Sequence, residues 1–155
     1  MPKRNIKQRE GMVDISGKEM TKRTAAASCE VRMSAQTFET LMKEGSPKGN
    51  VFETARVAGV MAAKSTASLI PLCHPLQLSK VKVSFAPDQN KKIVAVLSEV
   101  ICLGRTGVEM EALTAVTAAA LTIYDMMKWA DKGMTISEIK LLSKTGGKSG
   151  DFKRG

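Results

Sequence analysis

The chain has 155 residues, of which 43% are hydrophobic and 25% charged, and its formal net charge is +9. This length and composition are typical of one globular domain, and they exclude a disordered or fibrous segment. No stretch reaches the roughly 18 apolar residues of a membrane span, and the basic start has no apolar run of a signal peptide behind it. Because Cys29, Cys73 and Cys102 are odd in number and widely spaced, we expect a cytoplasmic protein.

The excess positive charge lies at the two ends of the chain. Residues 1–12 and 144–155 each carry four basic and one acidic side chain, which leaves 16 basic and 13 acidic residues between them. With aromatic residues at 4%, the chain offers few platforms on which bases could stack, so we expect no nucleic-acid partner. We interpret residues 1–12 as a flexible basic tail, 13–143 as a single domain, and 144–155 as a Gly/Lys-rich C-terminal tail.

The first half of the chain predicts one strand and two helices. Residues 24–33 alternate like a strand, and residues 34–43 form a short helix that begins at a serine N-cap. The glycine- and proline-containing segment 45–49 ends that helix. Residues 50–69 form a longer helix, because an asparagine and a glutamate three residues apart resemble a capping box. The proline-rich segment 71–75 cannot continue it.

The second half predicts a hairpin, a helix and a strand. Residues 80–85 alternate cleanly, residues 87–90 are typical of a turn, and residues 92–103 are rich in valine and isoleucine. Residues 108–129 favour a helix through alanine, leucine and methionine, and residues 136–142 form a last strand. The complete order predicts an α+β fold, namely a ferredoxin-like βαββαβ domain with an additional helix and an antiparallel sheet.

The last predicted helix carries an uncharged run between Glu111 and Asp125, so most of its surface must be buried by the sheet or by another subunit. Asp125 and Lys128 lie about 4.5 Å apart along the helix axis and can reach each other or a shared ligand. Two interpretations stay open: an exposed ion pair of about 0.3 to 0.5 kcal/mol, or a pair that passes protons to a substrate. Glu111 lies roughly 21 Å from Asp125, so both serve one small substrate only if two subunits share the site.

His74 is the only histidine, and the prolines around it restrict its backbone. It is either a structural or solvated residue, or a side chain presented to a ligand. Cys73 beside it is not expected to form a nucleophilic pair with it, because such partners meet through space. Several basic residues in or beside predicted loops could gather phosphate oxygens: Arg23, Lys48, Lys64, Lys144 and Lys148.

Five ordered motifs carry a resemblance to a known family. They are KGNVF at 48–52, LCHPL at 72–76, TGVEMEA at 106–112, IYDMMK at 123–128 and KTGGKSGDF at 144–152. From about residue 13 to residue 153, the chain closely resembles the cyclic pyranopterin monophosphate synthases, the accessory protein C of molybdenum cofactor biosynthesis. The one mild departure is Asn50, where some relatives have aspartate, and it affects that contact only.

The resemblance implies a lyase that converts a 3',8-cyclized dihydro-GTP into cyclic pyranopterin monophosphate and releases pyrophosphate. It also implies a ferredoxin-like subunit, a homohexamer built as a trimer of dimers, and catalytic sites at subunit interfaces to which the C-terminal tail contributes. Asp125 and Lys128 correspond to the catalytic pair. The implied substrate-binding residues are Leu72, Cys73, His74, Met110, Glu111, Arg23, Lys48, Glu109 and Lys144.

The residues themselves suggest no resident cofactor. One histidine makes a zinc site improbable, and although magnesium can accompany a triphosphate, no acidic cage in the sequence requires it. Two other classes of function compete with the synthase: a basic RNA- or nucleotide-binding module of the same fold, and a purely structural oligomer. The first lacks the aromatic strand motif of RNA-recognition domains, and catalytic turnover separates both from an enzyme.

Overall fold

The computed structural model describes residues 10–155, so most of the predicted N-terminal tail lies outside the described residues. In chain order the elements are β1 (Thr21–Arg32), α1 (Ala35–Lys43), α2 (Val51–Lys64), α3 (Thr66–Leu69), β2 (Leu78–Asp88), β3 (Ile93–Gly104), α4 (Glu109–Met127), β4 (Thr135–Thr145) and β5 (Phe152–Lys153). No helix in residues 10–155 is both long and apolar enough to cross a bilayer.

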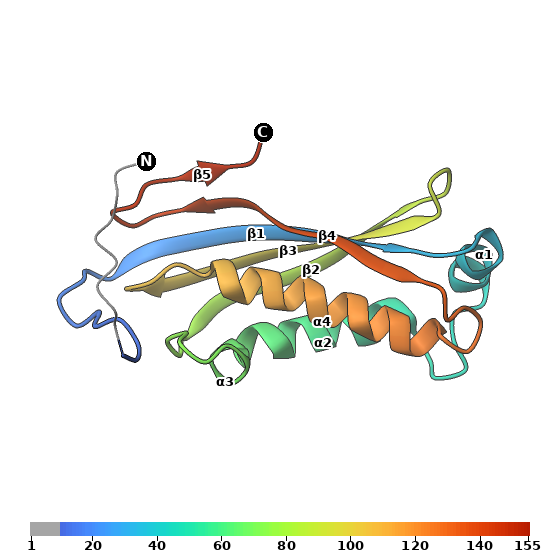
Figure 1. The fold of residues 1–155 in the computed structure, drawn as a ribbon, viewed down its shortest axis with the longest axis horizontal. Helices are drawn as coiled ribbons and strands as arrows, with labels where there is room; N and C mark the ends of the chain where they lie inside the picture. Colours follow the sequence, from blue (N-terminus) through green and yellow to red (C-terminus); the bar gives the residue numbers. More distant parts are fainter. Residues whose placement is uncertain (1–9) are drawn as a thin grey trace.

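The strands form one antiparallel sheet in the order β2-β3-β1-β4-β5 (Figure 1). Without β5, this order and the chain path match the ferredoxin-like arrangement, and the α+β prediction is confirmed. The helices α2 and α4 lie side by side against one face of the sheet, and α1 is the additional helix beyond the βαββαβ pattern.

Small side chains build the core between the sheet and the helices. In β1 every second residue is buried, from Ala25 to Val31, because successive strand side chains point to opposite faces. At Gly59 the helices come so close that an added Cβ would lie 2.9 Å from the carbonyl oxygen of Ala115 and 3.0 Å from Val83. A thin, alanine-rich layer therefore holds α4 against its neighbours.

The predicted long helix does not reach Leu69 unbroken. It ends at Lys64, and Ser65 leaves helical geometry with φ −105° and ψ 10°. The hydroxyl of Thr66 donates to the carbonyl oxygens of Ala62 at 3.1 Å and Ala63 at 2.9 Å, so a side chain satisfies acceptors that a continuing helix would use. The two predicted N-caps are confirmed, since the side chains of Ser34 and Asn50 accept from Thr37 and Glu53.

The C-terminal segment is a hairpin where the sequence predicted a polar tail. β4 continues to Thr145, and β5 turns back so that Ser143 pairs with Lys153 and Lys144 with Phe152. Inside the turn the amide of Gly146 donates to Asp151 Oδ1 at 3.1 Å. This places the Gly/Lys-rich residues beside the start of β1.

Candidate active site

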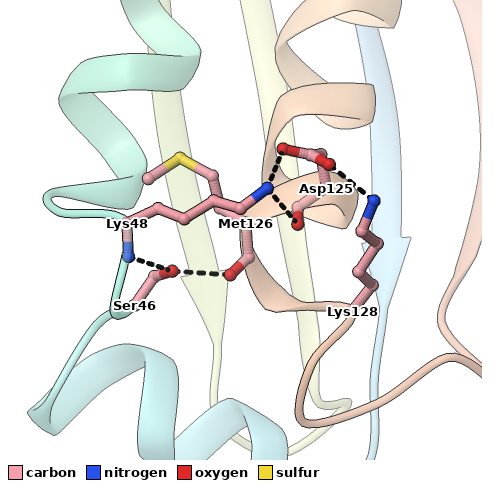
Figure 2. A network of polar contacts seen from close by, with 5 residues as sticks. All are labelled: Ser46, Lys48, Asp125, Met126 and Lys128. Carbon is pink, nitrogen blue, oxygen red and sulfur yellow. Dashed lines mark hydrogen bonds and ion pairs between the residues drawn. The ribbon is translucent and has the colours of Figure 1, made fainter.

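A three-residue ionic cluster lies at the C-terminal end of α4 (Figure 2). Lys128 Nζ lies 2.8 Å from Asp125 Oδ1, and Lys48 Nζ lies 2.7 Å from Asp125 Oδ2. The Asp125 side chain is 51% exposed, so a ligand in solution can reach it. We call Lys48, Asp125 and Lys128 the lysine–aspartate cluster.

The loop before α2 is fastened to α4, which explains how Lys48 reaches Asp125. Ser46 Oγ donates to the carbonyl oxygen of Met126 at 2.7 Å, and the Lys48 amide donates to Ser46 Oγ at 3.1 Å (Figure 2). Gly49 ends the loop at φ +117°, a conformation that side chains rarely adopt. Gly49 and Ser46 thus position Lys48 beside the C-terminal end of α4, which is distant in sequence.

The contact between Asp125 and Lys128 favours the charged form of both groups. Hydrogen bonds from Lys128 and then Lys48 lower the pKa of Asp125 to about 2. The hydrogen bond with Asp125 raises the pKa of Lys128 above its ordinary value. At neutral pH Asp125 is therefore a carboxylate and Lys128 an ammonium, and the two lysines of the cluster can pair with the oxygens of a phosphate.

A second group of predicted site residues lies at the other end of α4. A cavity of about 230 Å³ is lined by Leu72, Cys73, His74, Leu76, Thr106, Gly107, Glu109, Met110 and Glu111. Glu111 is 4% exposed, and burial raises the pKa of its carboxyl. Burial and then the charge of Glu111 raise the pKa of the Cys73 thiol. Cys73 therefore stays a neutral thiol, as a residue that only contacts a ligand would.

The ring of His74 has a backbone partner. Its Nε2 lies 2.7 Å from the carbonyl oxygen of Val13. A carbonyl oxygen only accepts hydrogen bonds, so this contact requires the proton of His74 on Nε2. In the neutral ring, Nδ1 is then free to accept a hydrogen bond from a ligand.

A larger cavity of about 620 Å³ adjoins the second group and contains both Arg23 and Lys144. Lys144 Nζ lies 3.5 Å from Glu109 Oε1. Arg23 is buried, and it donates from Nε to the carbonyl oxygen of Gly104 at 3.3 Å and from Nη2 to that of Arg105 at 3.2 Å. Arg23 thus uses two guanidinium nitrogens to hold the backbone of the cavity wall.

The glycines of the motifs shape this region, although sequence reasoning assigned them no role. An added Cβ at Gly107 would lie 2.0 Å from Glu109 Oε2, and one at Gly147 would lie 1.8 Å from Arg23 Nη1. The Glu109 carboxylate therefore folds over one glycine, and the Arg23 guanidinium packs on the other. The only signal in the sequence was the presence of both glycines inside the quoted motifs.

The structure thus brings the predicted residues into two groups and not one. The lysine–aspartate cluster is one group, and the residues around His74, Glu109 and Glu111 form the other. Rising 1.5 Å per residue, α4 separates Glu111 from Asp125 by roughly 21 Å. Lys64, at the C-terminal end of α2, lines neither of the two cavities described above.

Comparison with known proteins identifies the family. Residues 12–147 match the model of the MoaC family. A cyclic pyranopterin monophosphate synthase of Desulforapulum autotrophicum is 57% identical over 91% of this chain and 86% of the relative. Two further relatives have the same name. The synthase of Parvibaculum lavamentivorans is 54% identical over 92% of this chain and 89% of the relative. The synthase of Listeria monocytogenes is 52% identical over 96% of this chain and 92% of the relative. The chain therefore belongs to the MoaC family.

Proposed function

We propose that this chain is a cyclic pyranopterin monophosphate synthase, a phosphorus–oxygen lyase of molybdenum cofactor biosynthesis. Its substrate would be (8S)-3',8-cyclo-7,8-dihydroguanosine 5'-triphosphate, and its products cyclic pyranopterin monophosphate and pyrophosphate. The observation that carries this proposal is the lysine–aspartate cluster, in a chain more than half identical to relatives of that name.

The cluster suits the chemistry of this reaction. Forming the cyclic phosphate expels pyrophosphate, so negative charge builds on the leaving group while protons move during ring rearrangement. Lys128, held beside Asp125, would stabilise that charge as an ammonium and act as the general acid. Asp125, a carboxylate with a lowered pKa, would orient Lys128, and Lys48 would bind phosphate oxygens.

The second group of residues would bind the remainder of the substrate. Leu72, Cys73, His74, Met110 and Glu111 line the smaller cavity, which offers apolar contacts and few polar groups. His74 and Glu111 would hydrogen-bond the ring system. Glu109 lines both cavities, Lys144 approaches it from the larger one, and Arg23 would position the wall around them.

One substrate cannot touch both groups on the same chain, because α4 separates them. We therefore propose that the site is shared, with the cluster of one subunit facing the His74 group of a partner. A homohexamer built as a trimer of dimers provides such interfaces. Exposed apolar residues on the outer faces of the helices, among them Val57, Met61 and Leu121, are suited to subunit contacts.

Subunit mixing tests the shared site. His74→Ala and Lys128→Ala chains should each be inactive alone. Mixed one to one and allowed to exchange, they should recover activity at about a quarter of the sites, since each intact site needs its two halves from different variants. A mixture that gains no activity, although mass measurement shows mixed oligomers, would contradict the shared site.

The proposal includes no resident metal. Within residues 10–155, no three His, Cys, Asp or Glu side chains gather as metal ligands. Magnesium bound to the triphosphate would enter with the substrate. The three cysteines are unpaired, which suits the reducing cytoplasm that we propose as the location.

Pyrophosphate release from the cyclized substrate tests the function directly. The wild-type chain should release pyrophosphate, and Lys128→Ala should abolish release while the oligomer persists. Lys43→Ala is the matched control, because Lys43 is an exposed lysine on α1 with only a weak partner in Glu39 at 3.9 Å. A wild-type chain that releases no pyrophosphate would refute the proposed function. Full release of pyrophosphate by Lys128→Ala would refute the catalytic role of Lys128.

A further inference from the structure

The segment before β1 runs from His74, which lines the smaller cavity, to the wall of the larger cavity. Near its start, the carbonyl oxygen of Val13 lies 2.7 Å from His74 Nε2, and near its end the carbonyl oxygen of Lys18 accepts from Arg105 Nε at 2.9 Å. We call residues 13–18 the strap. Figure 1 shows it at the end of the molecule where β3 ends and β4 turns into β5.

The strap is fastened to the sheet through a chain of contacts. The buried Arg23 of β1 holds the backbone of residues 104 and 105 through two carbonyl oxygens. The side chain of Arg105 then holds the backbone of Lys18. A turn inside the strap, from the Lys18 amide to the Ile15 carbonyl oxygen at 3.0 Å, keeps it compact. The position of Lys18 is therefore set by the core.

The strap places Lys18 in the wall of the larger cavity, which is strongly basic. Five basic residues, Lys18, Arg23, Arg105, Lys144 and Lys148, line it together with two acidic ones, Glu19 and Glu109. Arg23 is bonded to carbonyl oxygens and Lys144 is near Glu109, so Lys18 and Lys148 are the lysines most available to a ligand.

The same wall contains an unsatisfied polar atom. The hydroxyl oxygen of Thr21 is buried and has no hydrogen-bond partner among the described residues. A buried polar group normally finds a partner, so this atom indicates that the cavity accommodates a polar ligand. Excess positive charge and a free hydroxyl together suit a chain of phosphate groups.

We propose that Lys18 is a further substrate-binding residue, which contacts the polyphosphate part of the substrate, and that Arg105 is the residue that positions it. The inference rests on the proposed function for the identity of the substrate. The binding of a polyphosphate by this wall rests only on the geometry and charge just described.

The first test measures binding without catalysis. The full-length chain is titrated with inorganic tripolyphosphate by calorimetry, as wild type, Lys18→Gln, Lys18→Arg and the control Lys43→Gln. We expect Lys18→Gln to weaken binding about three- to tenfold, because a charge-assisted contact with a phosphate is stronger than an ordinary surface ion pair. Lys18→Arg and Lys43→Gln should stay within about twofold of wild type. A wild-type chain that binds no tripolyphosphate, or Lys18→Gln with wild-type affinity, overturns the proposal.

The second test separates positioning from stability. Arg105→Gln should speed amide hydrogen exchange in residues 13–18 and weaken tripolyphosphate binding, whereas Arg105→Lys should restore part of both, because lysine also donates. Unchanged exchange and affinity in Arg105→Gln would remove Arg105 from the proposal.

Kinetics distinguish this inference from the function on which it rests. With the cyclized substrate, Lys18→Gln should raise KM about three- to tenfold and leave kcat within about twofold, because the contact acts on binding. If the wild type turns over and Lys18→Gln changes neither KM nor tripolyphosphate affinity, the inference fails alone. If the wild type releases no pyrophosphate but Lys18→Gln still weakens tripolyphosphate binding, the function fails and the anion site stands.

Discussion

Glu111 and Asp125 occupy opposite ends of α4 and have opposite electrostatic environments. Glu111, in the first turn, is buried, and burial raises its pKa. Asp125, in the last turn, is half exposed, and two lysines lower its pKa to about 2. One carboxyl is thus set to hold a proton more readily than usual and the other to release it.

Asp125 should titrate far below its ordinary pKa of 3.8. Because the folded pKa is lowered, the stabilisation from its ion pairs is present above pH 3.8 and is lost as the pH falls toward 2. NMR titration of the carboxyl carbon checks the midpoint. Lys128→Ala should raise it more than Lys48→Ala, because the Lys128 hydrogen bond has the larger effect. Equal Asp125 titration midpoints in wild type and both variants would show that neither lysine lowers the pKa of Asp125.

Glu111→Gln should stabilise the folded chain more at pH 7 than at pH 4. The raised pKa means that folding favours the protonated carboxyl, so the wild type loses stability as the pH rises through the folded pKa. A neutral amide has no such loss. Thermal unfolding of both proteins across this pH range measures the difference in stability between Glu111→Gln and wild type. If the stability gained by Glu111→Gln shrinks as the pH rises, the pKa of the buried Glu111 carboxyl is not raised.

Gly107→Ala should damage activity without unfolding the protein. The new methyl group would displace the Glu109 carboxylate, whose oxygen lies 2.0 Å from the added Cβ, and would break the contact with Lys144. A misplaced site group costs roughly 10- to 100-fold in kcat/KM. The melting temperature should change by less than about 2 °C, because the displaced atoms are the mobile end of a side chain. Wild-type kinetics in this variant would show that Glu109 needs no fixed position.

Gly59→Ala should lower the free energy of unfolding by about 1 to 2 kcal/mol. Alanine favours a helix by about 1 kcal/mol over glycine, but here the methyl group would meet the α4 backbone. Urea unfolding at fixed protein concentration measures the change. Lys64→Ala, on the same helix, is the comparison and should stay within about 0.5 kcal/mol of wild type.

The fold was predictable where the residues repeat with a clear period or carry a local signal. Alternation marks β1 and β2, and valine and isoleucine mark β3. The caps at Ser34 and Asn50 need only neighbours within three residues. The break after Lys64 and the short β5 were missed, since the first depends on the side-chain hydrogen bonds of Thr66 and the second on a partner strand.

The candidate site, like the fold, was predictable from the sequence only in part. The contact between Asp125 and Lys128 follows from helical spacing, because residues three apart are neighbours on one face. Lys48 joins Asp125 across 77 residues, and Arg23 reaches Gly104 across 81. No local pattern encodes such distances. The loop position of Lys48 suggested a phosphate contact, but its contact with Asp125 and the carbonyl partners of Arg23 required the structure.

The close packing of α4 limits how the length of this protein can change. Inserting one residue into α4 would turn Asp125 by about 100° relative to Glu111 and lengthen the helix by about 1.5 Å. The thin alanine layer leaves no room to absorb such a rotation. The turn after Asp88, whose side chain accepts from the amides of Asn90 and Lys91, lies at an exposed hairpin tip. Insertions and deletions should therefore be tolerated at this tip and excluded from α4, whose residue count sets the spacing between the two groups of candidate site residues.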